Sequence, residues 1–176
     1  MVARYQSGSG TVAAVLGHPL HPMVVPLPIG ALVGAFVADL IFLATDNSFW
    51  AEAAFWLIAA GLVTGAAAAL LGIIEMMGLR RARTMGLAWL HGMLNILALG
   101  ISGISCLMRQ SDMEGVAGGI GGYMTGAVVL LLAVSGWAGG EMAYRHGLGV
   151  GTNVGAPGEA TDHERTPSQR PDDGLA

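Results

Sequence analysis

The sequence predicts an all-α protein, an up-down bundle of four transmembrane helices with a short N-terminal interfacial segment and a disordered C-terminal tail. Of the 176 residues, 53% are hydrophobic and 11% are charged, whereas charged residues usually make up about 25% of a chain. The mean hydropathy is +0.61. This composition excludes a disordered chain, a disulfide-rich secreted domain and a nucleic-acid-binding protein with a basic face.

Four nearly uncharged stretches are each about twenty residues or longer, the length that crosses about 30 Å of hydrocarbon as a helix. They cover residues 26–45, 53–74, 84–108 and 115–140. Lipid cannot hydrogen-bond a bare backbone, so a spanning segment must be a helix or part of a closed barrel. The strict two-residue alternation of a barrel is absent from the sequence. The polar loops, predicted at residues 46–48, 78–83 and 109–114, are short, so consecutive helices should be antiparallel neighbours.

The chain divides into three parts by composition. Residues 1–22 form the predicted N-terminal interfacial segment, which ends in a His-Pro loop, and residues 23–150 form the transmembrane domain. Residues 151–176 are rich in Gly, Pro, Ser, Thr and acidic side chains without an apolar period, so they should be a disordered polar tail.

The arginines predict the orientation of the bundle in the membrane. With four spans, both termini lie on one side, and most arginines outside the tail fall there: Arg4, Arg80, Arg81, Arg83 and Arg145. The opposite side has Arg109 among four carboxylates. Because basic loops are retained on the cytoplasmic side, both termini should be cytoplasmic.

Histidines mark a candidate site on the cytoplasmic side. Four of them fall at or near that side once the topology is drawn: His18, His21, His91 and His146. Glu75 ends the second span at the same level, and Asn95 shares a helix face with His91. We expect His18 or His21, together with His91 and His146, to converge on one pocket with Glu75 near its rim.

Such a pocket suggests two kinds of chemistry. Imidazoles on neighbouring helices can ligate haem b axially, with His91 and either His21 or His146 as ligands, or these three can hold a metal ion with Glu75. Asn95 and Glu75 would orient the imidazoles, and the cytoplasmic arginines could pair with haem propionates. Alternatively, the histidines form a structural polar network between helices.

Asp39 is a second polar feature, about twelve residues into the first span and past its midpoint. A carboxylate there costs about 2.5–3.5 kcal/mol on the insertion scale, so it should face protein or water rather than lipid. Thr64 on the second span is a candidate partner. The residue is either a proton-relay site or a carboxyl that hydrogen-bonds two helices together.

These features support three functional hypotheses. The first is a redox-associated membrane subunit that binds haem b or a metal and passes electrons to a partner protein. The second is a non-catalytic scaffold or accessory subunit, and the third and weakest is a small transporter or proton channel, which would require a homo-oligomer. Phosphate-binding loops, nucleophile motifs and zinc-protease helices are absent from the sequence, so nothing in it indicates an enzyme.

Three segments stand out together: the His-Pro-Leu-His-Pro run at 18–22, the Leu-His-Gly-Met-Leu-Asn run at 90–95 and the Tyr-Arg-His-Gly run at 144–147. They resemble the DUF2231 family of predicted bacterial membrane proteins, and the resemblance implies a protein integral to a bacterial cytoplasmic membrane. The resemblance covers residues 12–150, although the family commonly has Asp where this chain has Glu75. Some relatives carry a Rieske iron–sulfur domain, which implies an association with electron transfer. The tail of this chain has no cysteine and one histidine, so iron–sulfur chemistry is not expected here.

Overall fold

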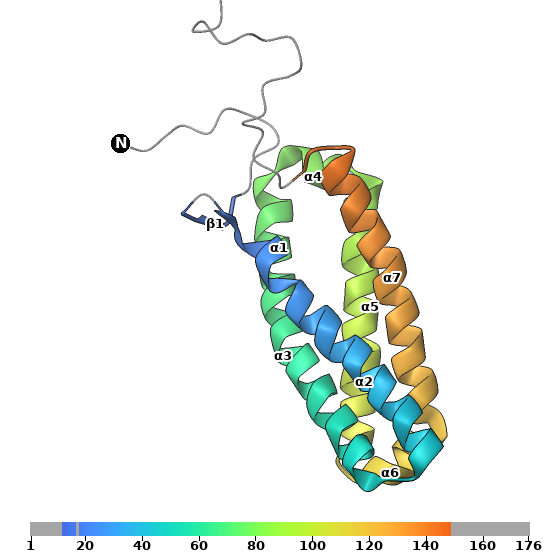
Figure 1. The fold of residues 1–176 in the computed structure, drawn as a ribbon. Coiled ribbons are helices and arrows are strands. Elements are labelled where there is room, and N and C mark those ends of the chain that lie inside the picture. The colour runs from blue at the N-terminus through green and yellow to red at the C-terminus, as the bar shows by residue number, and fades with distance from the viewer. Residues whose placement is uncertain (1–11, 17, 149–176) are drawn as a thin grey trace, which may run out of the picture.

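The computed structural model describes residues 12–16 and 18–148; the predicted tail and the first eleven residues of the predicted interfacial segment lie outside them. Among the described residues, four helical spans are long and apolar enough to cross a membrane: Leu20–Thr45, Ser48–Gly78, Gly86–Arg109 and Met113–Tyr144. They run up and down in chain order (Figure 1). The predicted four-helix transmembrane bundle is therefore confirmed.

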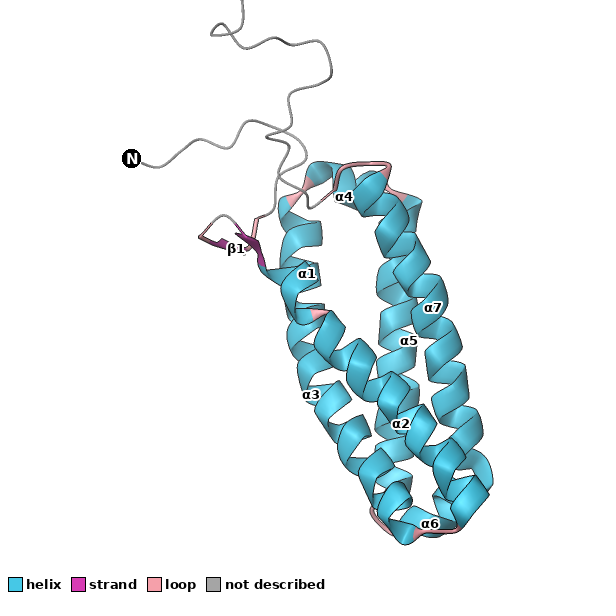
Figure 2. Cartoon of the chain, viewed as in Figure 1, coloured by secondary structure: helices cyan, strands magenta, loops and turns pink. Residues whose placement is uncertain are grey.

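Figure 2 shows the same chain by secondary structure, with helices dominating and one small pair of strands. In order, the elements are β1 (Ala14–Val15), β2 (His18–Pro19), α1 (Leu20–Val24), α2 (Pro26–Thr45), α3 (Ser48–Gly78), α4 (Arg80–Thr84), α5 (Gly86–Arg109), α6 (Met113–Val116), the π-helical turn η1 (Ala117–Gly121) and α7 (Gly122–Tyr144). The strands β1 and β2 pair antiparallel just before α1. The described part of the predicted interfacial segment is thus a small hairpin that runs directly into α1, and the predicted His-Pro loop is instead strand β2 and the start of that helix.

Local sequence signals set several helix ends. Pro26 begins α2, where its missing N–H costs no helical hydrogen bond. Asp46 ends the same helix in the left-handed conformation, with φ 51°. The Asn47 side chain then accepts a hydrogen bond from the backbone N–H of Phe49 at 3.0 Å and caps α3. Asp112 caps α6 in the same way, by accepting from the Gly115 N–H at 2.8 Å.

Two polar segments predicted as loops are partly helical. Residues 78–83 contain the short helix α4, which buries Ala82 while Arg80, Arg81 and Arg83 stay exposed. Arg109, placed by sequence reasoning in the loop after the third span, is the last residue of α5 and is completely buried. Sequence reasoning assigns Arg109 to a loop because it is charged and follows an apolar run, and the sequence does not show that an acidic side chain on another helix pairs with it.

The four spans pack as two close pairs, α2 with α3 and α5 with α7, which join through fewer contacts between α3 and α5 and between α2 and α7. One buried cluster, Leu32, Ala98 and Val128, joins three spans near the middle. A second, Phe42, Ala51 and Ala117, lies where α2 ends and α3 begins. The core is therefore centred on the middle and on this end of the bundle.

The last span is not one uninterrupted α-helix, as the apolar stretch 115–140 had suggested. It begins as α6, passes through η1 and continues as α7. Gly119 inside η1 has non-helical dihedrals, φ −108° and ψ −113°. Glycine tolerates such a conformation because it has no Cβ. The interruption shifts the residues that follow relative to the other helices.

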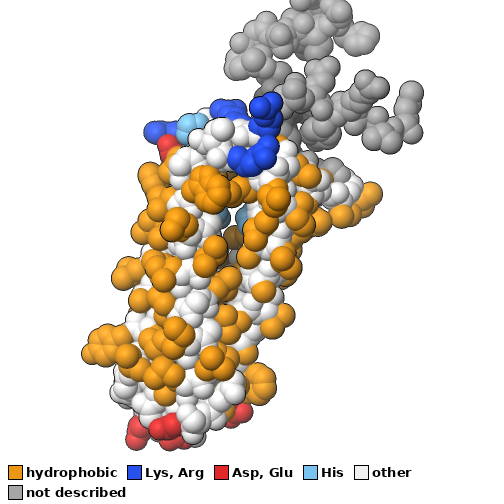
Figure 3. Space-filling model, turned by 180° about the vertical axis from the view of Figure 1, so that it is seen from behind, with side chains coloured by type: hydrophobic (Ala, Val, Ile, Leu, Met, Phe, Trp, Pro, Cys, Tyr) orange, Lys and Arg blue, Asp and Glu red, His pale blue; other side chains and the backbone are white. Residues whose placement is uncertain are grey.

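Charge separates to the two ends of the molecule, with an apolar surface between them. Figure 3 shows the arginines at one end with one acidic side chain beside them, the other visible carboxylates at the opposite end, and hydrophobic side chains over the faces of the helices. Large apolar side chains such as Trp56, Val63 and Leu130 are exposed along the spans. These faces suit contact with lipid tails, which agrees with an integral membrane protein.

Candidate functional site

His21 lies in α1 and points at α3. Its Nδ1 is 2.9 Å from the backbone carbonyl oxygen of Ala68, so the ring donates a proton there when Nδ1 is protonated. One turn further along α3, a Cβ added at Gly72 would lie 3.1 Å from the His21 ring. Glycine at this position therefore lets the imidazole lie close against the α3 backbone.

His91 lies in α5 and points at α7. Its Nδ1 is 2.8 Å from the carbonyl oxygen of Ser135 and 2.9 Å from the hydroxyl oxygen of the same residue. The Asn95 amide donates to the Ser135 hydroxyl at 2.7 Å and lies 3.2 Å from His91 Nε2. A Cβ at Gly139 would lie 3.3 Å from the ring. His91 thus faces the protein interior rather than lipid.

The structure brings His21 and His91 together from opposite helix pairs. Their ring centroids are 6.4 Å apart and their planes are at 85°. Figure 3 shows the surface hollowed just below the arginine-bearing end, with histidine atoms visible inside the hollow. Two imidazoles at one level between α1 and α5 therefore form the centre of the candidate site.

The other predicted members of the pocket make no hydrogen bond to this pair among the described residues. The His18 ring is exposed and bonds the Leu16 carbonyl of its own hairpin at 3.1 Å. His146 lies past the end of α7, and its ring makes no hydrogen bond to any residue in the described ranges. Glu75 lies one turn beyond Gly72 on α3, with a buried Oε1 that has no partner among the described residues.

Across residues 12–16 and 18–148, no three His, Cys, Asp or Glu side chains are grouped closely enough to hold a metal ion. The predicted metal-binding set of His21, His91 and His146 is therefore not assembled. His146 follows the last residue of α7, Tyr144.

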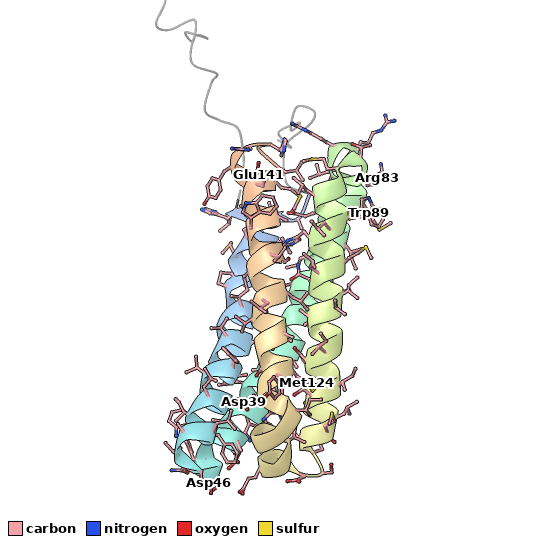
Figure 4. All side chains as sticks on the ribbon, turned by 90° about the vertical axis from the view of Figure 1, so that its right-hand side faces the viewer. Asp39, Asp46, Arg83, Trp89, Met124 and Glu141 are labelled. Carbon is pink, nitrogen blue, oxygen red and sulfur yellow. The ribbon has the colours of Figure 1, made fainter. Side chains whose placement is uncertain are left out.

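Asp39 forms a second buried polar site, toward the acidic end of the bundle. Figure 4 shows it inside the bundle at the end marked by Asp46 and remote from Arg83 and Glu141. Its Oδ2 accepts hydrogen bonds from Arg109 Nη2 at 2.7 Å and from the Thr125 hydroxyl at 2.8 Å. Both charged side chains are 0% exposed. Three spans, α2, α5 and α7, therefore meet at this ion pair.

The predicted partner of Asp39, Thr64, is not its partner. The Thr64 hydroxyl donates to the Ala60 carbonyl one turn back on α3, at 2.7 Å. A threonine hydroxyl in a helix commonly donates to a carbonyl of its own helix. Thr64 therefore needs no hydrogen-bond partner on α2. Thr125 on α7 takes that role instead.

Arg109 is the functional residue that sequence reasoning missed. Its Nε donates to the Ser105 hydroxyl one turn back on α5, at 3.3 Å. A signal existed, because Arg109 is the lone arginine on the far side of the predicted topology and Asp39 is displaced toward that side. A carboxylate in a membrane needs a cation, and the sequence offers few.

Four apolar spans with polar groups buried between them define an integral membrane protein of the four-helix class. A family model described as "Predicted membrane protein (DUF2231)" matches residues 17–152, and the chain belongs to this family. Searches among curated proteins and among solved structures gave no match.

Proposed function

We propose that this protein is a redox-associated subunit of a bacterial cytoplasmic membrane, and that it binds haem b between His21 and His91. The observation that carries the proposal is the spacing of the two rings, with centroids 6.4 Å apart. Two imidazoles on opposite sides of one metal ion have centroids roughly 6 Å apart, because each metal–nitrogen bond is about 2 Å. Axial ligation by two histidines is an established mode of haem binding.

The hydrogen bonds of both rings support the same assignment. Each Nδ1 lies within 2.9 Å of a backbone carbonyl, Ala68 for His21 and Ser135 for His91. A carbonyl at Nδ1 selects the tautomer whose Nε2 carries the lone pair, and ligating histidines are commonly held in this way. These carbonyls would leave Nε2 of each ring as the nitrogen available to a metal.

The surroundings also suit an anionic, planar ligand. Gly72 and Gly139 keep side-chain bulk away from the two imidazoles. Exposed arginines of α4 lie at the same end of the bundle, where they could pair with propionates (Figure 3). Bound haem would supply one-electron transfer, and the protein would position it within reach of an electron-transfer partner.

A second function, that of a non-catalytic accessory subunit, is favoured by the contacts of Asn95. Its amide lies 3.2 Å from His91 Nε2, the atom that a metal would need. With Ser135, these residues form a hydrogen-bonded network between α5 and α7 that is satisfied without a ligand. In this case the histidines stabilise the bundle and bind nothing.

An absorption spectrum and metal analysis of protein purified from haem-replete cells test the proposal. We expect a Soret band with about one haem per chain, lost in His91→Ala and in His21→Ala. His18→Ala is the matched control, because His18 bonds only its own hairpin among the described residues, and it should retain the band. A colourless, metal-free wild type would overturn the haem proposal and leave the accessory role, in which His91→Gln keeps the fold.

The arginine end is proposed to face the cytoplasm, together with both termini. Exposed Arg80, Arg81 and Arg83 lie at this end, and exposed acidic residues lie at the other (Figure 3). Basic segments near span ends are retained on the cytoplasmic side.

A further inference from the structure

The buried ion pair of Asp39 and Arg109 leaves two polar atoms without partners among the described residues. Asp39 Oδ1 and Arg109 Nη1 are both inaccessible to solvent and make no hydrogen bond there. Each belongs to a group that is already bonded through its other atom, Oδ2 or Nη2, at 2.7 Å. Each free atom is therefore separated from the existing contact by a single carbon.

Such atoms are costly to bury. An unsatisfied buried polar atom costs about 1–3 kcal/mol, and more when the group is charged. The neighbouring side chains do not relieve them, because Thr125 binds Asp39 Oδ2 and Ser105 binds Arg109 Nε. Asp39 Oδ1 and Arg109 Nη1 thus remain for a further hydrogen-bonding group.

The chemistry of the two atoms identifies that group. A single group that serves both atoms has to donate a hydrogen bond to the carboxylate and accept one from the guanidinium. A cation would be repelled by Arg109 and an anion by Asp39, so the group is neutral. The smallest molecule that both donates and accepts is water, and buried waters typically satisfy otherwise unpaired polar groups.

The backbone around the pair supports a built site. A Cβ at Gly121 would lie 2.5 Å from Arg109 Nη2 and 2.5 Å from the Val116 carbonyl oxygen. The π-helical turn η1 therefore brings the α7 chain against the guanidinium only because glycine stands there. π-helical turns are rare and are frequently found at functional sites.

We propose that an internal water molecule is bound between Asp39 Oδ1 and Arg109 Nη1, so that the ion pair is hydrated within the membrane. The water completes the hydrogen bonds of both charges. It also places an exchangeable proton beside a carboxylate that is remote from His21 and His91. The proposal is independent of haem binding.

Infrared spectroscopy of the protein in lipid nanodiscs tests this. We expect a water O–H stretching band that shifts in H₂¹⁸O and is lost in Asp39→Asn. The double variant Asp39→Asn with Arg109→Gln should also lose the band. It leaves no unpaired buried charge, so it should fold even if the single variant does not. Thr125→Val is the matched control, because it removes a hydroxyl that binds the other carboxylate oxygen, and it should keep the band.

A high-resolution map of the wild type gives the direct result. Density for a water within hydrogen-bonding distance of both Oδ1 and Nη1 would support the proposal. A bidentate ion pair without water, or a water band unchanged in both the single and double variants, would overturn it.

Discussion

Charged residues inside the bundle are few, and their pairing determines what each one costs. Asp39 and Arg109 are both 0% exposed and meet at 2.7 Å. Removing one partner of a buried pair leaves an uncompensated charge and destabilises a protein by about 3–5 kcal/mol, whereas replacing both is much milder. The contribution of this ion pair to the free energy of unfolding should therefore appear mainly as a coupling energy between Asp39 and Arg109.

Asp39→Asn and Arg109→Gln should each lower the free energy of unfolding by about 3–5 kcal/mol. The double variant should lose clearly less than the sum, because neither charge remains unpaired. Denaturant titration in detergent micelles measures all three, and the double-mutant cycle gives the coupling energy. Strictly additive losses would show that the two side chains do not interact in the membrane.

At the scale of the element, the last span shows how glycine determines where a helix can approach its neighbour. Gly121 lies in η1 against Arg109, whereas a Cβ at Gly136, within α7, would meet no atom within 4 Å. The same residue type thus has opposite roles in adjacent elements. One glycine admits a buried guanidinium, and the other lies in open space.

Gly121→Ala should destabilise the protein by about 1–3 kcal/mol, the usual cost of overpacking. Gly136→Ala is the control and should be neutral or stabilising by up to about 1 kcal/mol, because alanine favours a helix. Thermal unfolding of both variants in the same detergent measures the difference. Equal changes in the unfolding temperature of the two variants would mean that Gly121 is not packed against the Arg109 guanidinium.

At the scale of the whole molecule, the two helix pairs are joined differently at their two ends. At the acidic end, Arg109 and Thr125 donate hydrogen bonds across to Asp39 on the other pair. At the arginine end, His21 and His91 approach each other at 6.4 Å without a direct hydrogen bond among those found. A ligand between these rings would join the pairs at the end where no hydrogen bond between the described residues links them.

The proposed orientation predicts which end reagents reach in intact cells. Ser48 and Thr84 are both exposed. Ser48 begins α3 at the acidic end of the bundle, and Thr84 ends α4 at the arginine end. With native Cys106 changed to Ser, Ser48→Cys should react with a membrane-impermeant maleimide in intact cells. Thr84→Cys should react only after permeabilisation. The reverse pattern of labelling would place the arginine end outside.

Much of the architecture could be predicted from local sequence alone. The span 26–45 coincides with α2, and the other three spans agree to within a few residues except at the ends of α3. Hydropathy reports whether a segment suits lipid, and it acts residue by residue along the chain. For the same reason it did not show the interruption at η1, where the apolar character continues while the backbone changes.

The sequence by itself determined that this is a four-span membrane protein, that Asp39 must be shielded from lipid and that His91 shares a face with Asn95. Only the tertiary structure decided the partners: Arg109 and Thr125 for Asp39, and His21 for His91. Arg109 is 70 residues from Asp39. Such pairings depend on the rotation and relative height of whole helices, which the packing of many side chains sets together. Periodicity within one segment does not contain that information.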